Sequence, residues 1–510
     1  MANFIKNYKY QILLWIFIVA YIIYFSYFTI LRYRTLYASY YDLGIMHQTV
    51  YNSYQAIKTG DWGRFLELTN PTGSEQIKRL AIHNDILLGL ISPFYFIHAG
   101  PETLLVIQSI ISALGALAIY KITLIIFKEK KSFTPAYRQA GLIFSLSYLL
   151  YPSLERANIY DFHAVTLSTT LLLFMFYFWL VKNYKLSYLF LLLSILSKEQ
   201  VALTTSFFGI YILTTTLRSI VVKREKKQKL FYAGIVILIS FVWFVFSIFF
   251  IIPILRGGQH FAVARYSDFG DSPIRIIIGV LTNPYSISKY LLRVDTLRYL
   301  IFLLGPVGFL SLLSPAQLFI SLPEFAINLL SKSPNMRNII YQYTAVITPF
   351  VFISAIYGAK KISNIKYQIS KLHNIMQNGQ FLTVFILLFS LAFAYFKGPL
   401  PFSKEANIHP IKYPQKEAKD AAFWGKTLRD EKLKVSTTGQ LSPFFTSRRY
   451  FYNFSPNYYL ADYVLVRLNE IYNYPEKGQL IPVYERLRRD SNFELIYQRE
   501  NFEVYKKVKF

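Results

Sequence analysis

Apolar residues in this chain occur in long uninterrupted runs rather than in alternation with polar ones. The runs 11–30, 231–253 and 381–396 contain no charged residue. A helix needs about 20 consecutive apolar residues to cross the hydrocarbon core of a bilayer. Because lipid offers the backbone no hydrogen-bond partner, such runs fold as helices inside the membrane. The pattern therefore predicts a mainly α, polytopic membrane protein.

The charged segments between the runs predict how the chain is oriented. Basic residues cluster in the short segments 128–138, 218–229 and 360–371, and short basic loops face the cytoplasm. All three fall on one side if the stretch 82–98, which contains two histidines, an aspartate and a proline, is a juxtamembrane or re-entrant helix. We therefore expect about eleven spans in the plasma membrane, with a cytoplasmic N-terminus and an extracytoplasmic C-terminus. The spans are 11–30, 102–127, 139–157, 164–181, 186–200, 201–218, 230–253, 296–313, 315–330, 341–358 and 380–396. The span 230–253 leads to a predicted polar outer loop at 254–295.

The tail reads differently from the rest of the chain. Residues 415–430 form a charged amphipathic pattern typical of a helix, and strand-like runs follow at 434–436, 449–454 and 462–467. The segment 493–508 resembles a hairpin that turns at Glu500-Asn501. We therefore predict a transmembrane domain at 1–396, with an outer loop at 31–80, and a soluble extracytoplasmic α/β domain at 397–510 with a small, mainly parallel sheet.

The formal net charge of +27 would suggest nucleic-acid binding in a soluble protein. Here the basic residues lie in loops between spans, so the expected partner is the lipid bilayer and nucleic acid is not expected. The chain has no cysteine, which excludes disulfides, thiolate metal sites and a cysteine nucleophile.

Most of the informative polar residues fall on the predicted outer side. Asp42 opens the first outer loop, and His47 and Gln48 follow at helical spacing. An alternative interpretation makes Asp42 the N-cap of that helix. The other candidates lie at span ends or in outer loops; they are His83, Asp161, His163, Glu199, Arg256, Arg265, Glu324, Arg337 and Tyr341.

These carboxylates, histidines and arginines on one face are typical of a site for an anionic, membrane-borne substrate. Arginine binds phosphate in a bidentate manner. A carboxylate acts as a base, or as a ligand for a hard divalent cation such as Mg²⁺ or Mn²⁺. Zinc is an alternative, but the sequence has no HExxH spacing. It also has no P-loop, no GxSxG and no dinucleotide-binding glycine pattern.

Several of these residues belong to motifs that resemble a known family. The segments are Tyr41-Asp42-Leu43-Gly44-Ile45-Met46-His47-Gln48, Asp161-Phe162-His163, Ser197-Lys198-Glu199, Leu322-Pro323-Glu324 through Asn328-Leu329-Leu330, Tyr341-Gln342-Tyr343-Thr344 before Pro349, and, in the tail, Ser436 to Pro443 with Arg448 and Ala461-Asp462-Tyr463. They are similar to a family of multi-pass prokaryotic membrane proteins classed as a domain of unknown function. The likeness covers nearly the whole chain, and the family is related to the GT-C membrane glycosyltransferases.

This resemblance implies a GT-C-like helical domain and a polyprenyl-phosphate-linked sugar donor. GT-C enzymes carry an acidic residue just after the first span, a place that Asp42 occupies here, and Asp161 matches a second acidic position by location. The Lys-Pro-Pro-Leu-like stretch of related enzymes would fall near 82–93, where this chain has His83-Asn84-Asp85 instead.

The glycosyltransferase hypothesis assigns a role to each group of residues. Asp42 orients or deprotonates the acceptor hydroxyl. Asp161, His163 or Glu199 assists, or binds a cation that bridges the donor phosphate, and Arg256, Arg265 or Arg337 holds that phosphate. The acceptor would be an envelope glycan, lipid or protein. The alternatives are a lipid or solute transporter or flippase, which needs polar residues across the whole membrane, and a non-catalytic scaffold that displays the outer domain.

Overall fold

The computed structural model describes residues 2–128, 135–219, 222–368 and 380–508, so parts of the three basic segments lie outside the described residues. The chain divides into two compact units. The helical unit comprises Met1–Phe25, Gln108–Tyr160 and Ala164–Asn407. The mixed unit comprises Ser26–Ile107, Asp161–His163 and Ile408–Phe510.

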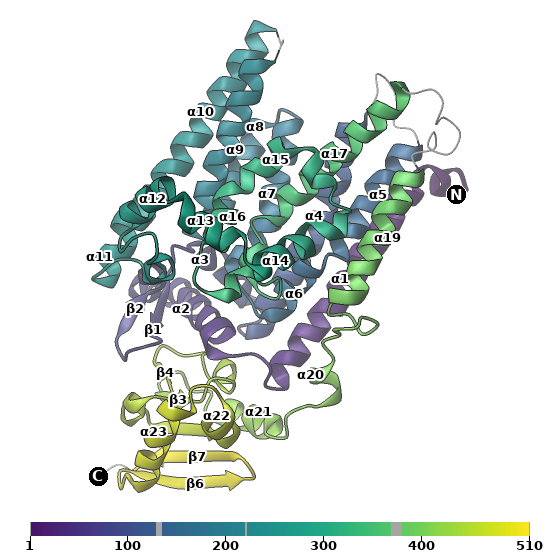
Figure 1. Cartoon of the computed structure of the whole chain (residues 1–510). Coiled ribbons are helices and arrows are strands. Elements are labelled where there is room, and N and C mark those ends of the chain that lie inside the picture. The colour runs from purple at the N-terminus through teal and green to yellow at the C-terminus, as the bar shows by residue number, and fades with distance from the viewer. Residues whose placement is uncertain (1, 129–134, 220–221, 369–379, 509–510) are drawn as a thin grey trace. The chain divides into compact units, whose positions relative to one another are not determined.

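Long helices make up most of the helical unit (Figure 1). They are α1 (Ala2–Arg34) and α4 (Pro101–Phe127), which both continue into the mixed unit, and α5 (Pro135–Leu149), α6 (Pro152–Tyr160), α7 (Ala164–Leu180), α8 (Tyr184–Ile195), α9 (Glu199–Arg218), α10 (Lys223–Phe246), α17 (Thr348–Gln368) and α19 (Gln380–Lys397). Helices α7 and α8 pack against each other, as do α9 and α10. The Asn183 side chain accepts the Leu186 N–H at 3.2 Å and so caps the start of α8.

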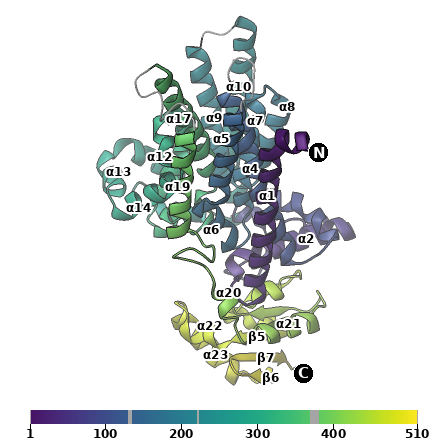
Figure 2. The ribbon, with the colours of Figure 1, turned by 90° about the vertical axis from the view of Figure 1, so that its right-hand side faces the viewer.

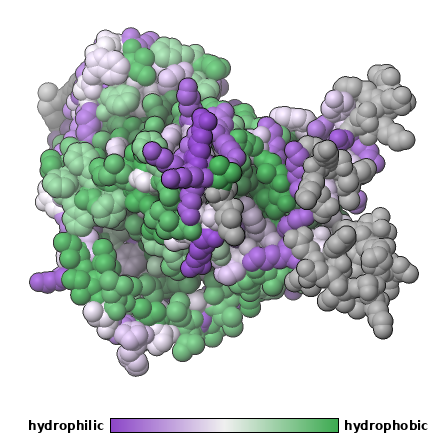
Figure 3. All heavy atoms as spheres, turned by 90° about the horizontal axis from the view of Figure 1, so that it is seen from above, coloured by the Kyte–Doolittle hydropathy of each residue, from purple (hydrophilic) through white to green (hydrophobic). Residues whose placement is uncertain are grey.

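Within the described residues, four helices are long and apolar enough to cross a membrane. They cover Tyr8–Arg34, Pro101–Phe127, Glu199–Arg218 and Lys223–Arg256. Other predicted spans correspond to helices that are shorter or less apolar, so the number eleven stays a prediction. The face seen from above in Figure 3 shows many hydrophobic side chains beside hydrophilic ones.

The predicted spans 296–313 and 315–330 are not continuous helices. The chain there forms α14 (Val294–Leu304), the 3₁₀ turns η7 (Gly305–Val307) and η8 (Leu310–Leu313), α15 (Pro315–Leu318), η9 (Phe319–Ser321) and α16 (Leu322–Leu329). Several of these pieces have a proline in their first turn. A proline removes a helical hydrogen bond and clashes with the preceding turn, so the helix is interrupted there. The predicted polar loop 254–295 is also largely helical, with α11 (Ile252–Arg256), η6 (Phe261–Tyr266), α12 (Pro273–Thr282) and α13 (Pro284–Leu291).

The mixed unit contains a five-stranded sheet with strand order β4-β3-β5-β7-β6. Strands β3 (Val435–Thr437), β4 (Phe451–Asn453) and β5 (Tyr463–Arg467) are parallel, whereas β6 (Phe493–Arg499) and β7 (Phe502–Lys507) form an antiparallel hairpin beside β5. The hairpin turns at Glu500-Asn501, as predicted. The small C-terminal sheet is therefore confirmed, although only half of its strand pairs are parallel. Helices α20 (His409–Lys412), α21 (Ala418–Thr427), α22 (Leu468–Asn473) and α23 (Lys477–Arg489) accompany it.

The predicted outer loop 31–80 belongs to the same mixed unit as the sheet. It contains the π-helix η1 (Tyr40–Gly44), α2 (Ile45–Thr59) and the hairpin of β1 (Glu67–Thr69) and β2 (Gln76–Lys78). The turn η3 (Arg79–Ala81), α3 (Leu87–Ile91) and η4 (Ser92–Phe96) follow it in the same unit. Tyr40 and Leu68 from the loop share one hydrophobic core with Val435, Phe451 and Phe502 from the sheet. Burial of this shared apolar surface stabilises the loop and tail together. The predicted boundary near 397 stays a prediction.

Candidate functional site

Asp42 lies inside the short π-helix η1 at the start of the outer loop. The Gly44 N–H donates to the Ser39 carbonyl at 3.0 Å, which is the wide spacing of a π-turn. Such turns occur mostly inside helices and often at functional sites. Ser39 precedes η1 and Gly44 precedes α2, so Asp42 occupies neither N-cap position. The capping interpretation of Asp42 is therefore wrong.

The side chain of Asp42 is held by a histidine from a distant part of the chain. His163 Nε2 lies 2.9 Å from Asp42 Oδ1. The Asp42 side chain is 20% exposed and that of His163 only 7%. Both residues belong to the mixed unit, because the segment Asp161–His163 between α6 and α7 joins the outer loop there. The histidine thus orients a carboxylate that is still partly exposed to solvent.

Asp161 is a second carboxylate in the same unit, and its environment differs from that of Asp42. Its side chain is buried, and the Ser39 N–H donates to Asp161 Oδ2 at 3.2 Å. Burial holds the pKa of Asp161 well above its usual range, against the opposing charge of Arg32, while the nearby Asp42 raises it further. Two carboxylates in such different surroundings are suited to different chemical tasks.

His47 and Gln48 hold the outer loop against the tail. His47 is fully buried in α2, and its ring nitrogens meet the Tyr95 hydroxyl at 2.7 Å and the Ser447 hydroxyl at 2.8 Å. Burial lowers the pKa of His47 to about 3. The Gln48 amide donates to the Arg449 carbonyl at 3.0 Å. These contacts favour a structural role, and the predicted substrate contact of both residues stays a prediction.

His83 follows η3 and is half-buried. The loop that carries it is fixed by an ion pair between Arg79 and Asp85, with 2.8 Å between Nη2 and Oδ2 and both side chains about 4% exposed. Arg79 also donates through Nε to both carboxylate oxygens of Asp85. A buried pair with this many hydrogen bonds is costly to break, so Arg79 and Asp85 are held together on either side of His83.

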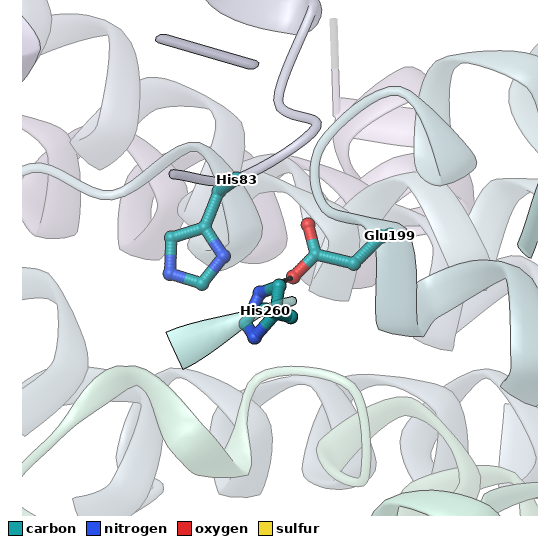
Figure 4. A group of neighbouring side chains, drawn as sticks. All are labelled: His83, Glu199 and His260. Carbon is teal, nitrogen blue, oxygen red and sulfur yellow. Dashed lines mark ion pairs between the residues drawn. The ribbon is translucent and has the colours of Figure 1, made fainter. Parts of the chain in front are cut away.

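The helical unit contains a separate pair, Glu199 and His260. Figure 4 shows the His260 ring beside the Glu199 carboxylate, with 3.3 Å between Nε2 and Oε1; it also draws His83 of the mixed unit. The Ala262 N–H donates to His260 Nδ1 at 3.0 Å. Because Nδ1 accepts a hydrogen bond, the neutral ring carries its proton on Nε2, the nitrogen that lies near Glu199. His260 was not among the predicted site residues, since the spacing of 61 positions from Glu199 gives no local signal.

The remaining predicted residues lie in the helical unit in other surroundings. Glu324 is fully buried and accepts a hydrogen bond from the Gln200 amide at 2.6 Å. Arg337 donates to Asp295 at 2.7 Å, and the ring of Tyr341 packs edge-on against that of Tyr160.

Arg256 and Arg265 share one aromatic neighbour. Their guanidinium groups lie 5.7 and 5.5 Å from the centre of the Phe261 ring, within the range of a cation–π contact. Their predicted role in phosphate binding stays a prediction, as does the predicted divalent cation.

A family model described as a predicted membrane protein (DUF2079) matches residues 32–504. The chain belongs to this family. The membership predicted from the motifs around Asp42, Asp161 and Glu199 is therefore confirmed. A comparison with curated proteins found no match.

Solved structures show what fold this DUF2079 protein has. Apo ArnT from Cupriavidus metallidurans matches with a TM-score of 0.50 and 10% identity, over 92% of this chain and 93% of that one. At such identity the likeness shows the fold alone, and the predicted relation to the GT-C superfamily stays a prediction.

Two archaeal structures match with lower scores. The Archaeoglobus fulgidus oligosaccharyltransferase AglB, in complex with an inhibitory peptide and a dolichol-phosphate, has a TM-score of 0.41 at 11% identity, over 99% of this chain and 75% of that one. The apo form of the A. fulgidus oligosaccharyltransferase gives 0.40 at 11% identity, over 97% and 74%.

Proposed function

We propose that this DUF2079 protein is a membrane glycosyltransferase that uses a polyprenyl-phosphate-linked sugar at the outer face of the plasma membrane. The observation that carries the proposal is the Asp42 carboxylate, partly exposed and held at 2.9 Å by His163. The GT-C-like fold supports it. The acceptor would be an envelope glycan, lipid or protein.

In the proposed reaction Asp42 acts as the base. An acceptor hydroxyl attacks the anomeric carbon of the donor sugar and loses its proton to the Asp42 carboxylate. A bond forms between the acceptor oxygen and the anomeric carbon. At the same time the bond between the anomeric carbon and the phosphate oxygen of the donor breaks. The electron pair of that broken bond leaves with the polyprenyl phosphate, which is already a stable anion. General-base catalysis of this kind contributes typically about 10²–10⁴-fold to a rate.

The two neighbours of Asp42 would serve it in different ways. His163 donates its Nε2–H to Oδ1, which orients the carboxylate toward an incoming hydroxyl. Asp161 is buried, and its raised pKa favours the neutral acid. A neutral Asp161 adds no negative charge next to Asp42, so it would not repel an anionic donor that binds nearby.

A transfer assay on the purified full chain tests the proposal. The protein is placed in nanodiscs with a radiolabelled polyprenyl-phosphate-linked hexose and a membrane extract as the source of acceptor. We expect release of polyprenyl phosphate and transfer of label, with Asp42→Asn losing at least about 10²-fold in rate. The matched control is Asp271→Asn, which removes an exposed carboxylate paired with Arg275.

Two results would overturn the proposal. One is the absence both of turnover and of binding of polyprenyl phosphate by the wild-type chain. The other is an Asp42→Asn variant that transfers label as fast as Asp271→Asn. A folded state equal to wild type, checked by thermal unfolding, is required of both variants.

A further inference from the structure

Helix α12 presents apolar side chains on two opposite faces. On its inner face, Ile276 and Val280 pack against the buried cluster of Phe269, Tyr290 and Leu330. On its outer face lie four exposed side chains, Ile274, Ile277, Ile278 and Leu281, which are 58%, 53%, 53% and 78% exposed. A helix that is apolar all round is not stable against water, so the outer face needs a cover.

The exposed apolar surface continues along the next two helices. Tyr285 on α13 is 78% exposed, Leu292 in the turn after it 84%, and Val294 and Leu297 on α14 are 73% and 60% exposed. Figure 2 shows α12, α13 and α14 together at one side of the helical unit. Soluble surfaces rarely expose so much contiguous apolar area without a partner. We call the segment 273–298 the platform.

Charged residues of the platform are mostly basic. Arg275, Lys289, Arg293 and Arg298 stand against one acidic residue of the platform, Asp295, which is bound to Arg337 at 2.7 Å. Asp271, just before the platform, pairs with Arg275 at 2.8 Å, so Lys289, Arg293 and Arg298 carry the excess of positive charge. The guanidinium of Arg293 lies 3.9 Å above the Tyr290 ring. Apolar side chains bordered by basic and aromatic ones are typical of a helix that lies in the membrane interface, where the basic groups meet anionic headgroups.

A hollow opens where the platform begins. It has a volume of about 470 Å³ and is lined by Ser267, Asp271 and Arg275 together with Ile278. It therefore combines polar groups at the start of α12 with the outer apolar face. A surface that joins these two properties fits a phospholipid, whose polar headgroup and acyl chains meet at the same boundary.

We propose that the platform lies on the membrane surface and binds the anionic phospholipids of the leaflet. The excess of basic residues selects this occupant over a neutral lipid. Its position in the chain agrees, because α10, which is long and apolar enough to span, leads into the segment through α11. The predicted polar loop thus becomes a lipid contact that does not depend on glycosyl transfer.

Spin labelling tests this proposal directly, because the chain has no cysteine and each introduced cysteine is unique. Leu281→Cys reports on the platform. Leu238→Cys on the outer side of α10 is the control for lipid depth, and Lys477→Cys, exposed on α23, is the control for water. Accessibility to oxygen and to a water-soluble nickel chelate is measured on full-length protein in nanodiscs.

We expect the Leu281→Cys label about 5–10 Å below the headgroups, between the two controls. In nanodiscs with phosphatidylglycerol it should lie deeper than in pure phosphatidylcholine. A Leu281→Cys label as accessible to nickel as Lys477→Cys overturns the proposal. So does a depth equal to that of Leu238→Cys, which would indicate a span, or dipolar broadening between labels, which would indicate a second copy of the chain.

A separate variant tests whether the basic residues of the platform select anionic phospholipids. Lys289→Gln combined with Arg298→Gln removes two exposed basic residues of the platform. We expect this variant to lose the depth difference between phosphatidylglycerol and phosphatidylcholine. The matched control, Lys432→Gln combined with Lys477→Gln, removes two exposed lysines of the tail and should keep it. Equal behaviour of the two double variants would overturn selection by charge.

Discussion

His163 Nε2 lies 2.9 Å from Asp42 Oδ1, although the two residues are 121 positions apart in the chain. The pair exists because three residues between α6 and α7 fold into the mixed unit with the outer loop. A histidine that is 7% exposed can hold a partly exposed carboxylate in one orientation, and catalysis depends on such positioning.

Replacing His163 should lower turnover while donor binding persists. We expect His163→Phe to reduce kcat about 10–100-fold with little change in KM for the donor, because orientation of Asp42 matters in the transition state. His163→Gln keeps an N–H donor and should recover part of the loss. Steady-state kinetics with the labelled donor measure both.

The control for this prediction is His98→Gln, an exposed histidine of the same unit that pairs with Glu102. It should keep wild-type kinetics. A His163→Phe variant with wild-type kcat would show that His163 does not position Asp42 for catalysis.

His47 should make the mixed unit sensitive to acid. Burial lowers its pKa to about 3 in the folded protein, against about 6.5 for an unfolded histidine. A depressed pKa contributes stability above pH 6.5 that is lost as the pH falls toward 3. By pH 5 the loss should reach about 2 kcal/mol. Thermal unfolding of the full chain at pH 5 to 8 measures it.

The matched variant His47→Gln does not titrate. It should be less stable at pH 7.5, because one amide cannot keep both hydrogen bonds, to Tyr95 and Ser447, at about 1 kcal/mol each. Between pH 7.5 and 5 its melting temperature should fall less than that of wild type. Parallel curves would show that another group carries the acid response.

Local patterns in the sequence predicted local structure well. The alternating residues around Glu500-Asn501 gave the hairpin of β6 and β7, and the charged stretch 415–430 gave α21. The hairpin and the helix both depend on residues that are close in the chain. The period of apolar residues therefore predicts them. The continuous span predicted at 315–330 failed because Pro315 and Pro323 start new helical pieces.

Contacts between distant residues were beyond sequence reasoning. Asp42 and His163 were both predicted site residues, but nothing in their spacing predicts the hydrogen bond between them. His47 was expected near a substrate, whereas it meets Ser447, 400 positions away. Such pairings follow from the packing of the whole mixed unit, which a single sequence does not report. The roles of the site residues therefore stay predictions.

Glu470 should act on the tail in the opposite direction to His47. It is buried at the start of α22, where it accepts the Thr438 hydroxyl at 2.8 Å and the Gln440 N–H at 2.9 Å. Burial raises its pKa to about 7, against about 4.3 when unfolded. A raised pKa contributes stability that is fully present below pH 4.3 and is lost as the pH rises through 7, by about 3 kcal/mol.

Comparison with Glu470→Gln isolates this effect, because the amide stays neutral. As the pH rises from 5 to 7.5, the melting temperature of the wild-type protein should fall relative to that of the variant. Glu494→Gln, on the exposed side of β6, should follow wild type throughout. A constant difference between wild type and Glu470→Gln over this range would contradict the prediction.

Two helical glycines should respond in opposite ways to alanine. At Gly358 in α17 an added Cβ would lie 2.1 Å from the Leu310 carbonyl oxygen, which is backbone and cannot rotate away. Overpacking of this kind costs about 1–3 kcal/mol or more. At Gly234 in α10 nothing lies within 4 Å of the added Cβ, and alanine favours a helix over glycine by up to about 1 kcal/mol.

We therefore expect Gly358→Ala to lower the melting temperature of the purified chain and Gly234→Ala to leave it unchanged or raise it. The two substitutions add the same methyl group to two helices of the helical unit, so their difference reports the close approach of α17 to the turn at Leu310. If both variants melted alike, the backbone at Leu310 would have to yield at little cost. The close approach of α17 to Leu310 would then not explain the glycine at position 358.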